Sequence, residues 1–313
     1  MLSWWSTSRP RAVRELVVLL ALVAMTTVAE ATGPNAAGTE PLRIGVVGFY
    51  NPRLMVLRYQ PLADYLTRTT DRRWELVVGT TYDRTVDALC RGELDLAYLG
   101  PYTYVRANAL CGAQAVARLR TRGKDTYRSV IMVRRDSALR KLRDLRGARI
   151  GFGELLSTSS HLVPLAMLTD AGIAPNAYTC RLYGHHEHAA RAVLLGEVDA
   201  CAVRDVVGDR FEERGMRVIA TSPPIPNFPF AMPADADPEL RREVVDALVT
   251  KPQRDPAARA AIEALDEELA DGFAECDDAD FDGLRELARR VFGPDALVAS
   301  EDELRVRSGC EGP

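Results

Sequence analysis

Apolar stretches of strand length alternate with amphipathic stretches along most of the chain. Residues 42–47 (LRIGVV) are almost continuously apolar and predict a buried strand, and residues 54–69 carry apolar positions at helical spacing. Residues 74–78 and 94–99 predict two further strands, again separated by a helical pattern. This order of strands and helices is typical of an α/β fold in which helices flank a mostly parallel sheet.

Two short motifs then recur at nearly the same offset. Residues 149–151 (RIG) repeat residues 43–45, and residues 196–200 (GEVDA) resemble residues 92–96 (GELDL). Because both copies lie in the same strand–helix–strand context, we expect two similar α/β lobes. Ligands of such sheets bind beyond the carboxyl ends of the strands, which predicts a ligand site in the cleft between the lobes.

The second lobe is bracketed by two strand-like passages, at 128–133 and 217–220, which predict a hinge of two strands. Helical patterns fill the rest of the chain, and we expect these C-terminal helices to pack back on the first lobe. The predicted boundaries are residues 42–133 together with 227–313 for lobe I, and residues 134–226 for lobe II.

The first 31 residues have the pattern of a secretory signal peptide. Several arginines precede an apolar run at 16–25, and Ala29 and Ala31 form an A-x-A cleavage site. The apolar run is shorter than the roughly 20 residues that cross a bilayer, which favours cleavage after Ala31 over an uncleaved anchor. We therefore expect a periplasmic protein that begins with a flexible leader at 32–41.

Composition and cysteine content narrow the function classes. The chain has 313 residues and a formal net charge of −4, whereas a nucleic-acid-binding protein would carry a basic face. Six cysteines in an exported chain favour disulfides. Cys90 and Cys111 fall at predicted helix ends and are candidates to pair, as are Cys276 and Cys310 in the tail. Buried free thiols are the alternative for some of them.

The most informative segment is a run of four hydroxyl residues, Ser157-Thr158-Ser159-Ser160, between a strand and an apolar helix. One of them is needed to cap the helix start, but capping does not require four. Free backbone N–H groups, hydroxyls and the positive end of the helix dipole together form an anion site that needs no Lys or Arg.

The histidines allow three interpretations. A metal site could use His161, His185, His186 and His188, although no Cys or carboxylate partner follows the spacing of a metal motif. A hydrolase could combine Ser157 or Ser159 with His186 and Glu187, but the G-x-S-x-G motif is missing. In the third interpretation one imidazole binds an anion.

The chain resembles the periplasmic phosphonate/phosphite/phosphate-binding proteins of ABC importers. The resemblance covers about residues 42–292, and its most specific part is the Ser-Thr-Ser helix start followed by a Gly-x-His segment. The resemblance rests on residues 42–47, 60–66, 94–101, 127–130, 157–159, 162–164, Gly184, His186 and 222–226.

The resemblance implies a type II periplasmic binding fold, in which two α/β lobes joined by a double-strand hinge close on a ligand. It assigns the phosphorus oxygens to Ser157, Thr158, Ser159 and His186 of lobe II. Two tyrosines of lobe I reach across the cleft, and they match Tyr82 and Tyr127. The implied partners are a small phosphorus oxyanion and a permease–ATPase complex. The protein is expected to be a monomer with no cofactor, no metal, no catalytic residue and no nucleic-acid partner.

The resemblance also has departures. Relatives that bind aminoethylphosphonate hold its ammonium with acidic residues, and Val206 and Phe228 stand at those places here. Arg204 and Asp205 stand where the commoner pattern has an acid first, and Ser160 replaces a glycine. We expect Arg204, Asp205, Val206 and Phe228 to line the pocket for the ligand's tail, and a smaller or apolar-tailed oxyanion to fit better than aminoethylphosphonate.

Two alternative functions stay open from the sequence. A protein with this fold can also report its ligand to a membrane kinase, and the histidine cluster could make the chain a metal-binding protein.

The implied fold further places Cys180 and Cys201 on strands that flank a central strand, about two strand spacings of 4.8 Å apart, which is too far for a disulfide.

Overall fold

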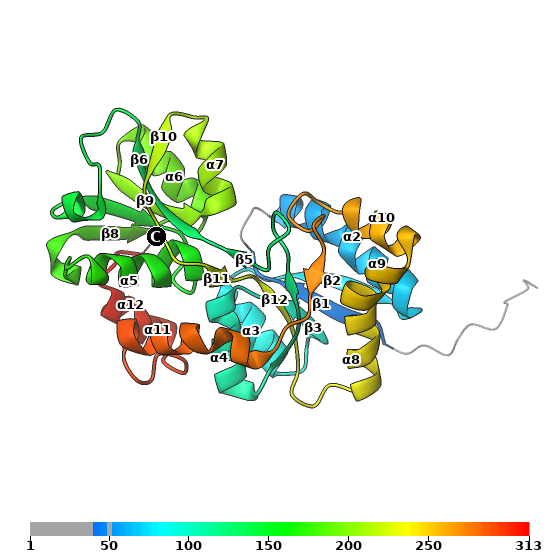
Figure 1. Cartoon of the computed structure of the whole chain (residues 1–313). Helices are drawn as coiled ribbons and strands as arrows, with labels where there is room; N and C mark the ends of the chain where they lie inside the picture. The colour runs from blue at the N-terminus through cyan, green and yellow to red at the C-terminus, as the bar shows by residue number, and fades with distance from the viewer. Residues whose placement is uncertain (1–39, 49–51, 313) are drawn as a thin grey trace, which may run out of the picture. The chain divides into compact units, whose positions relative to one another are not determined.

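A computed structural model describes residues 40–48 and 52–312 of the chain (Figure 1). The predicted signal peptide and all of the predicted leader except its last two residues lie outside the described residues. Residues 41–313 form one unit. In the described part of the chain, no helix combines the length and the apolar character needed to cross a membrane.

The first sheet has the strand order β13-β4-β12-β3-β1-β2, in which β1 lies parallel to β2 and β3. The strands β12 and β13 return antiparallel from the second half of the chain. Its strands are β1 (Leu42–Val46), β2 (Trp74–Val78), β3 (Leu96–Tyr98), β4 (Gln114–Leu119), β12 (Pro229–Met232) and β13 (Phe273–Ala274). The helices that follow its first strands are α2 (Pro52–Thr70), α3 (Tyr82–Cys90) and α4 (Pro101–Cys111).

The second sheet has the order β10-β6-β9-β7-β8, in which β7 lies parallel to β8 and β9. Its strands are β6 (Ser129–Arg134), β7 (Arg149–Phe152), β8 (Thr179–Leu182), β9 (Ala200–Arg204) and β10 (Met216–Thr221). Its helical segments are the π-helical turn η2 (Thr158–Leu162), α5 (Val163–Asp170), α6 (His186–Leu195) and α7 (Asp205–Glu212). The predicted architecture of two similar α/β lobes is confirmed.

The recurring motifs make the same contact in both lobes. The backbone N–H of Arg43 donates to Asp95 Oδ2 at 2.7 Å, and the N–H of Arg149 donates to Asp199 Oδ2 at 2.8 Å. Each aspartate returns its own N–H to the carbonyl of the same arginine. The repeat therefore fixes how the strand after the second helix enters each sheet. A Cβ at Gly45 would lie 2.3 Å from Leu94 Cδ1, so a larger residue here would displace the buried Leu94 side chain.

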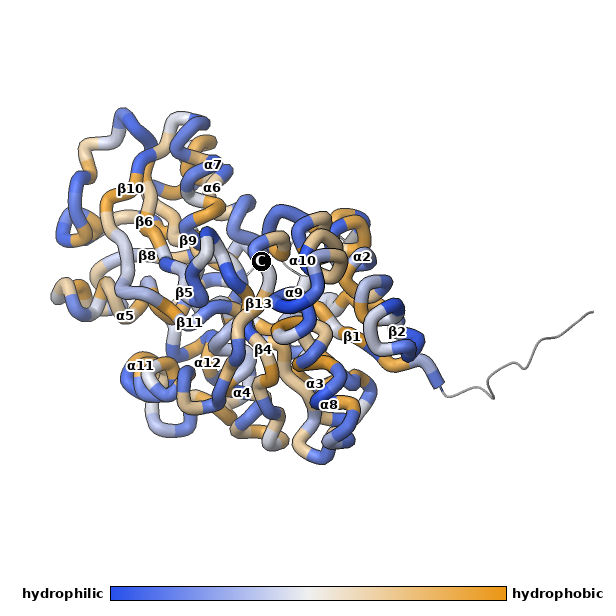
Figure 2. Tube along the Cα trace, turned by 45° about the vertical axis from the view of Figure 1, so that its right-hand side comes forward, coloured by the Kyte–Doolittle hydropathy of each residue, from blue (hydrophilic) through white to orange (hydrophobic). Residues whose placement is uncertain are grey.

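The hinge is formed by β5 (Thr126–Tyr127) and β11 (Ile225–Pro226), which pair antiparallel. The strands predicted for this role, at 128–133 and 217–220, are instead β6 and β10 of the second sheet. The predicted boundary after residue 133 is therefore wrong, because the apolar run of β6 is buried between β9 and β10. Figure 2 shows the apolar residues of strands such as β1 and β6 inside the lobes and hydrophilic residues on outer turns.

The tail packs on the first lobe only in part. It contains α8 (Pro238–Val245), η4 (Asp246–Thr250), α9 (Lys251–Arg254), α10 (Pro256–Glu263), α11 (Asp282–Phe292) and α12 (Glu301–Ser308). The helices α8 and α10 contact α2, as predicted, but α11 contacts both α4 and α5. Glu311 then forms a bridge to β8 of the second sheet. Assigning all of 227–313 to lobe I is therefore wrong for the end of the chain.

The disulfides correct one predicted pairing. Cys90 is bonded to Cys111, as predicted, but Cys310 is bonded to Cys180 rather than to Cys276. The bridge of Glu311 beside Cys180 brings the end of the chain to β8, which explains the observed partner. Cys201 and Cys276 are free thiols, and Cys201 lies on β9 with β7 between it and Cys180, as expected.

Candidate functional site

The hydroxyl run begins the helix that follows β7, at the carboxyl end of the parallel strands. Ser157 caps this helix, because its Oγ accepts the N–H of Ser160 at 3.2 Å. Ser160 is occupied within its own lobe, since its Oγ donates to the Ala202 carbonyl at 2.5 Å and accepts the Gly153 N–H at 2.7 Å. All four residues are buried. The structure thus leaves Ser157, Thr158 and Ser159 as candidate ligand contacts and gives Ser160 a structural role.

His186, the first residue of α6, determines whether the Ser157 hydroxyl can donate a hydrogen bond to a ligand. The backbone N–H of Arg204 donates to His186 Nδ1 at 3.0 Å, so the imidazole must carry its proton on Nε2. Nε2 lies 3.2 Å from Ser157 Oγ and donates to it. Because Ser157 Oγ already accepts from His186 and from Ser160, its own proton is free to be donated to a ligand.

The start of α4 in the first lobe faces this helix start. The backbone N–H of Tyr102 donates to Thr158 Oγ1 at 2.8 Å, a contact between the two lobes. A Cβ at Gly100 would lie 3.9 Å from Thr158 Oγ1, so this glycine borders the contact between the lobes. Two helix N-termini therefore direct their positive ends toward one region, which favours an anion there.

Tyr127 comes from the hinge strand β5 and is 2% exposed. Its hydroxyl lies near Ser159 and Thr158, but no hydrogen bond of good geometry joins it to any residue that the structure describes. Burial raises the pKa of Tyr127 to about 12, and the nearby Arg204 opposes this rise. The hydroxyl is therefore protonated at neutral pH and remains a donor.

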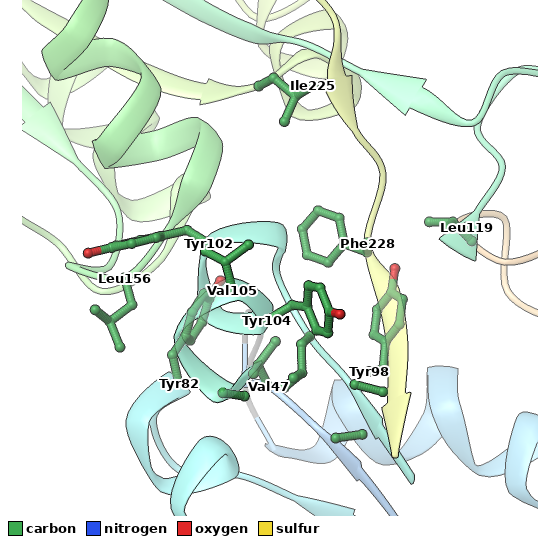
Figure 3. Packing of buried hydrophobic residues seen from close by; sticks show 14 of the residues in the cluster. Val47, Tyr82, Tyr98, Tyr102, Tyr104, Val105, Leu119, Leu156, Ile225 and Phe228 are labelled. Atoms are coloured by element: carbon green, nitrogen blue, oxygen red, sulfur yellow. The ribbon is translucent and has the colours of Figure 1, made fainter. Parts of the chain in front are cut away.

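Tyr82, the other predicted tyrosine, is the first residue of α3. Its ring is buried and points from α3 toward Tyr102 and Leu156 (Figure 3). It thus forms part of the first-lobe surface that faces the loop before Ser157. Tyr82 therefore belongs to the start of α3, whereas Tyr127 enters from the hinge strand β5.

Of the four residues predicted for the tail pocket, three lie together at one cavity and Asp205 binds backbone groups instead. Arg204 stacks on the rings of Tyr127 and Phe228, with its Cζ 4.9 Å and 4.7 Å from their centroids. Val206 lines a small cavity together with Arg204 and Phe228, whereas the carboxylate of Asp205 accepts the backbone N–H groups of Arg128 and Val206. A guanidinium thus lies against Tyr127, although the anion site predicted at the helix start needs no Lys or Arg.

Three first-lobe residues that the sequence did not single out hold Arg204. Its Nη1 is 2.6 Å from Glu268 Oε1, and its Nη2 donates to Asn227 Oδ1 at 3.2 Å and to Thr121 Oγ1 at 3.1 Å. Asn227 stands beside Phe228 in a segment already marked by the resemblance, so it could have been found. Glu268 lies in an acidic stretch far along the chain, and nothing local distinguishes it from its neighbours.

The metal and hydrolase interpretations find no support in the geometry. His161 is fully buried and donates from Nδ1 to the Leu155 carbonyl at 2.7 Å. Among the described residues, no group of His, Cys, Asp and Glu is arranged to hold a metal ion. Glu187, the proposed acid of a triad, forms ion pairs with Arg191 and Arg210, while His186 Nδ1 takes a backbone N–H.

We expect His186 to remain neutral well below the ordinary range of a histidine. Burial, helped by Arg204, lowers the pKa of His186 from 6.5 to about 3, and a proton on Nδ1 would face the Arg204 N–H. Because the unfolded chain takes up this proton and the folded chain does not, His186 makes the folded state less stable as pH falls below about 6.5.

Nitrogen NMR of histidine-labelled protein measures this protonation directly, with the His186→Asn variant used to assign the signal. We expect the Nε2–H tautomer to persist to about pH 5. A titration midpoint above pH 6 would contradict the geometry around Nδ1.

Comparison with known proteins is consistent with these observations. A family model described as the periplasmic phosphonate substrate-binding protein of ABC transporters matches residues 44–281. The chain is 26% identical over 277 residues to the phosphate-import protein PhnD of Mycolicibacterium smegmatis, covering 79% of this chain and 85% of that protein. It is 22% identical over 268 residues to the phosphonates-binding periplasmic protein of Escherichia coli, covering 80% and 78%.

A solved structure shares the fold. PhnD1 of Prochlorococcus marinus in complex with methylphosphonate superposes with a TM-score of 0.72 at 18% identity, covering 80% of this chain and 98% of that chain. Proteins of the matched family bind substrates for transporters and are not enzymes, and the homologues are periplasmic. This chain belongs to the phosphonate-binding family of periplasmic substrate-binding proteins of ABC transporters.

Proposed function

We propose that this chain captures a small phosphorus oxyanion between its lobes and delivers it to a permease and its ATPase. The observation that carries the proposal is a group of buried donors that lack acceptors. The Tyr127 hydroxyl and Arg204 Nε have no hydrogen-bond partner among the described residues, and the Ser157 proton is free. An unpaired buried donor costs roughly 1–3 kcal/mol, so a ligand with several acceptor oxygens would stabilise this arrangement.

The arrangement of these hydrogen-bond donors suits a tetrahedral ligand. Ser157 and Thr158 approach from the second lobe, the start of α4 approaches from the first lobe, and Tyr127 approaches from the hinge. A phosphorus oxyanion can accept hydrogen bonds from all of these directions at once. The free backbone groups at the helix starts add to the same positive potential, which matters in a chain of net negative charge.

The relatives support this ligand class. One relative is a phosphate-import protein, and one similar structure holds methylphosphonate. We therefore propose phosphate, phosphite or a phosphonate with a short substituent as the ligand of this chain.

Contacts at the site join the two lobes and hold them in a closed arrangement. The Tyr102 N–H bond to Thr158 and the Arg204–Glu268 ion pair both connect the first lobe to the second. Rotation about β5 and β11 would break them together and open the cleft. A ligand that binds to Ser157 and Thr158 and then to Tyr127 therefore favours the closed form.

A panel of phosphate, phosphite, methylphosphonate, sulfate and an alkanesulfonate tests the proposal. At least one phosphorus compound is expected to raise the melting temperature and to bind with one-to-one stoichiometry in calorimetry. A ligand at 100 times its Kd stabilises a protein by about 2.7 kcal/mol, which such a melting experiment detects. Binding of sulfate or the sulfonate, with no binding of any phosphorus compound, would contradict the proposal.

A further inference from the structure

The guanidinium of Arg204 forms part of the wall of two cavities. One cavity of about 30 Å³ is lined by Arg204, His186 and Phe228 together with neighbouring side chains. The other, of about 270 Å³, is lined by Arg204, Val206 and Glu268 and by charged residues of both signs. The two cavities share Arg204, Val206 and Glu268 and therefore adjoin each other, and the smaller one also shares His186 with the proposed oxyanion site.

First-lobe residues hold Arg204 in this position. Its Nη atoms are bound to Glu268, Asn227 and Thr121, and its plane stacks on two aromatic rings. Glu268 in turn accepts the Tyr98 hydroxyl at 3.3 Å. Arg204 cannot move toward the larger cavity or away from it without breaking a buried ion pair, so its position is fixed whenever the lobes are closed.

One hydrogen-bond donor of Arg204, its Nε–H, has no acceptor among the described residues. Its Nε is buried and makes no hydrogen bond to any described residue, although the residue is only 5% exposed. The Tyr127 hydroxyl, whose ring stacks on the same guanidinium, is also without a partner. Two unpaired donors on a stacked pair indicate that an acceptor belongs between them, and a ligand oxygen would supply it.

We infer that Arg204 determines which phosphorus oxyanions the site accepts. Its Nε–H binds one ligand oxygen, and its guanidinium closes the way into the 270 Å³ cavity, so that the ligand carries nothing larger than a methyl group on phosphorus. This inference rests on the proposed function and adds the residue that limits the size of the ligand's substituent.

The Arg204→Ala variant should invert the ligand preference. Loss of a charge-assisted hydrogen bond is expected to weaken phosphate binding by about 10- to 100-fold. The two cavities would then join, and the carboxylate of Glu268 would be free to pair with an ammonium group. The ratio of aminoethylphosphonate affinity to phosphate affinity is therefore expected to rise by about 100-fold or more.

Calorimetry on the full mature chain tests this with phosphate, methylphosphonate, aminoethylphosphonate and propylphosphonate. The matched control is Arg149→Ala, which removes an ion-paired strand arginine at the opposite end of the same sheet and should leave every affinity unchanged. Because Arg204→Ala leaves the buried Glu268 without its cationic partner, the double variant with Glu268→Gln is measured as well. It carries no lone charge and should gain propylphosphonate binding.

The outcomes separate the two proposals. Binding of phosphate by the wild type, with a changed ligand preference in either Arg204 variant, supports the inference. Binding by the wild type with the same order of affinities in both variants overturns the inference and leaves the proposed function standing. If the wild type binds none of phosphate, phosphite and methylphosphonate, the proposed function fails, and the inference fails with it.

Discussion

Replacing Ser157 and Thr158 together by alanine is expected to weaken phosphate binding by at least about 100-fold, because two hydrogen bonds to a charged ligand are lost. Ser157 is forced to donate by its two accepted hydrogen bonds, so no neighbouring group can take over its role. The Thr158 hydroxyl lies at the contact with α4 and so also affects closure.

The same change removes a helix cap, and this must be separated from the effect on the ligand. Loss of a serine cap costs about 1 kcal/mol of unfolding free energy. Ser300→Ala is the matched control, because Ser300 caps α12 in the same way and accepts the N–H of Glu303. Calorimetry should show unchanged phosphate affinity for Ser300→Ala. Full affinity in the Ser157/Thr158 variant would remove the helix start from the site.

Loss of the Cys180–Cys310 disulfide is expected to cause the largest fall in stability of any change considered. It joins residues 130 apart, whereas Cys90 and Cys111 are 21 apart. In the chain-entropy account, a loop longer than 100 residues contributes about 4–5 kcal/mol and a loop of about 20 residues about 3 kcal/mol. The melting temperature of a Cys180/Cys310 double alanine variant should fall by on the order of 10 °C.

The tail should also become loose in that variant. The Glu311 carbonyl accepts the Leu182 N–H at 2.8 Å, and the Glu311 N–H donates to the Cys180 carbonyl at 2.9 Å. Without the disulfide the end of the chain keeps these two hydrogen bonds to β8 but loses its covalent link, so limited proteolysis should remove it early. The Cys90/Cys111 double alanine variant is the control, and a larger loss of stability there would refute the assignment of the tail to lobe II.

The two-lobe architecture could be predicted from the sequence because the repeated motifs form the same contacts in both lobes. The paired RIG and GE(L/V)D motifs predicted two lobes, and each pair proved to make the same strand–turn contact. The hinge was misplaced because β6 and the true hinge are adjacent, and an apolar strand of six residues gives a stronger signal than two hinge residues. Periodicity cannot distinguish a strand that joins lobes from one that enters the next sheet.

Some of the predicted site residues lie in short motifs, and the structure places these motifs next to each other. Ser157 to Ser159 and His186 each stand at a helix start after a strand, and the fold brings them together. Arg204 was noticed only as part of a tail pocket, since its position depends on Glu268, which is distant in sequence. The partner of Cys310 was missed for a similar reason, because it depends on where the tail ends on β8.

A crystal structure of the mature protein grown with phosphate or methylphosphonate tests the central claim most directly. We expect phosphorus oxygens within hydrogen-bond distance of the Ser157 and Thr158 hydroxyls, the Tyr127 hydroxyl and Arg204 Nε, with His186 donating from Nε2 to Ser157. An anion bound elsewhere between the lobes, with Tyr127 and Arg204 Nε still lacking acceptors, would contradict it.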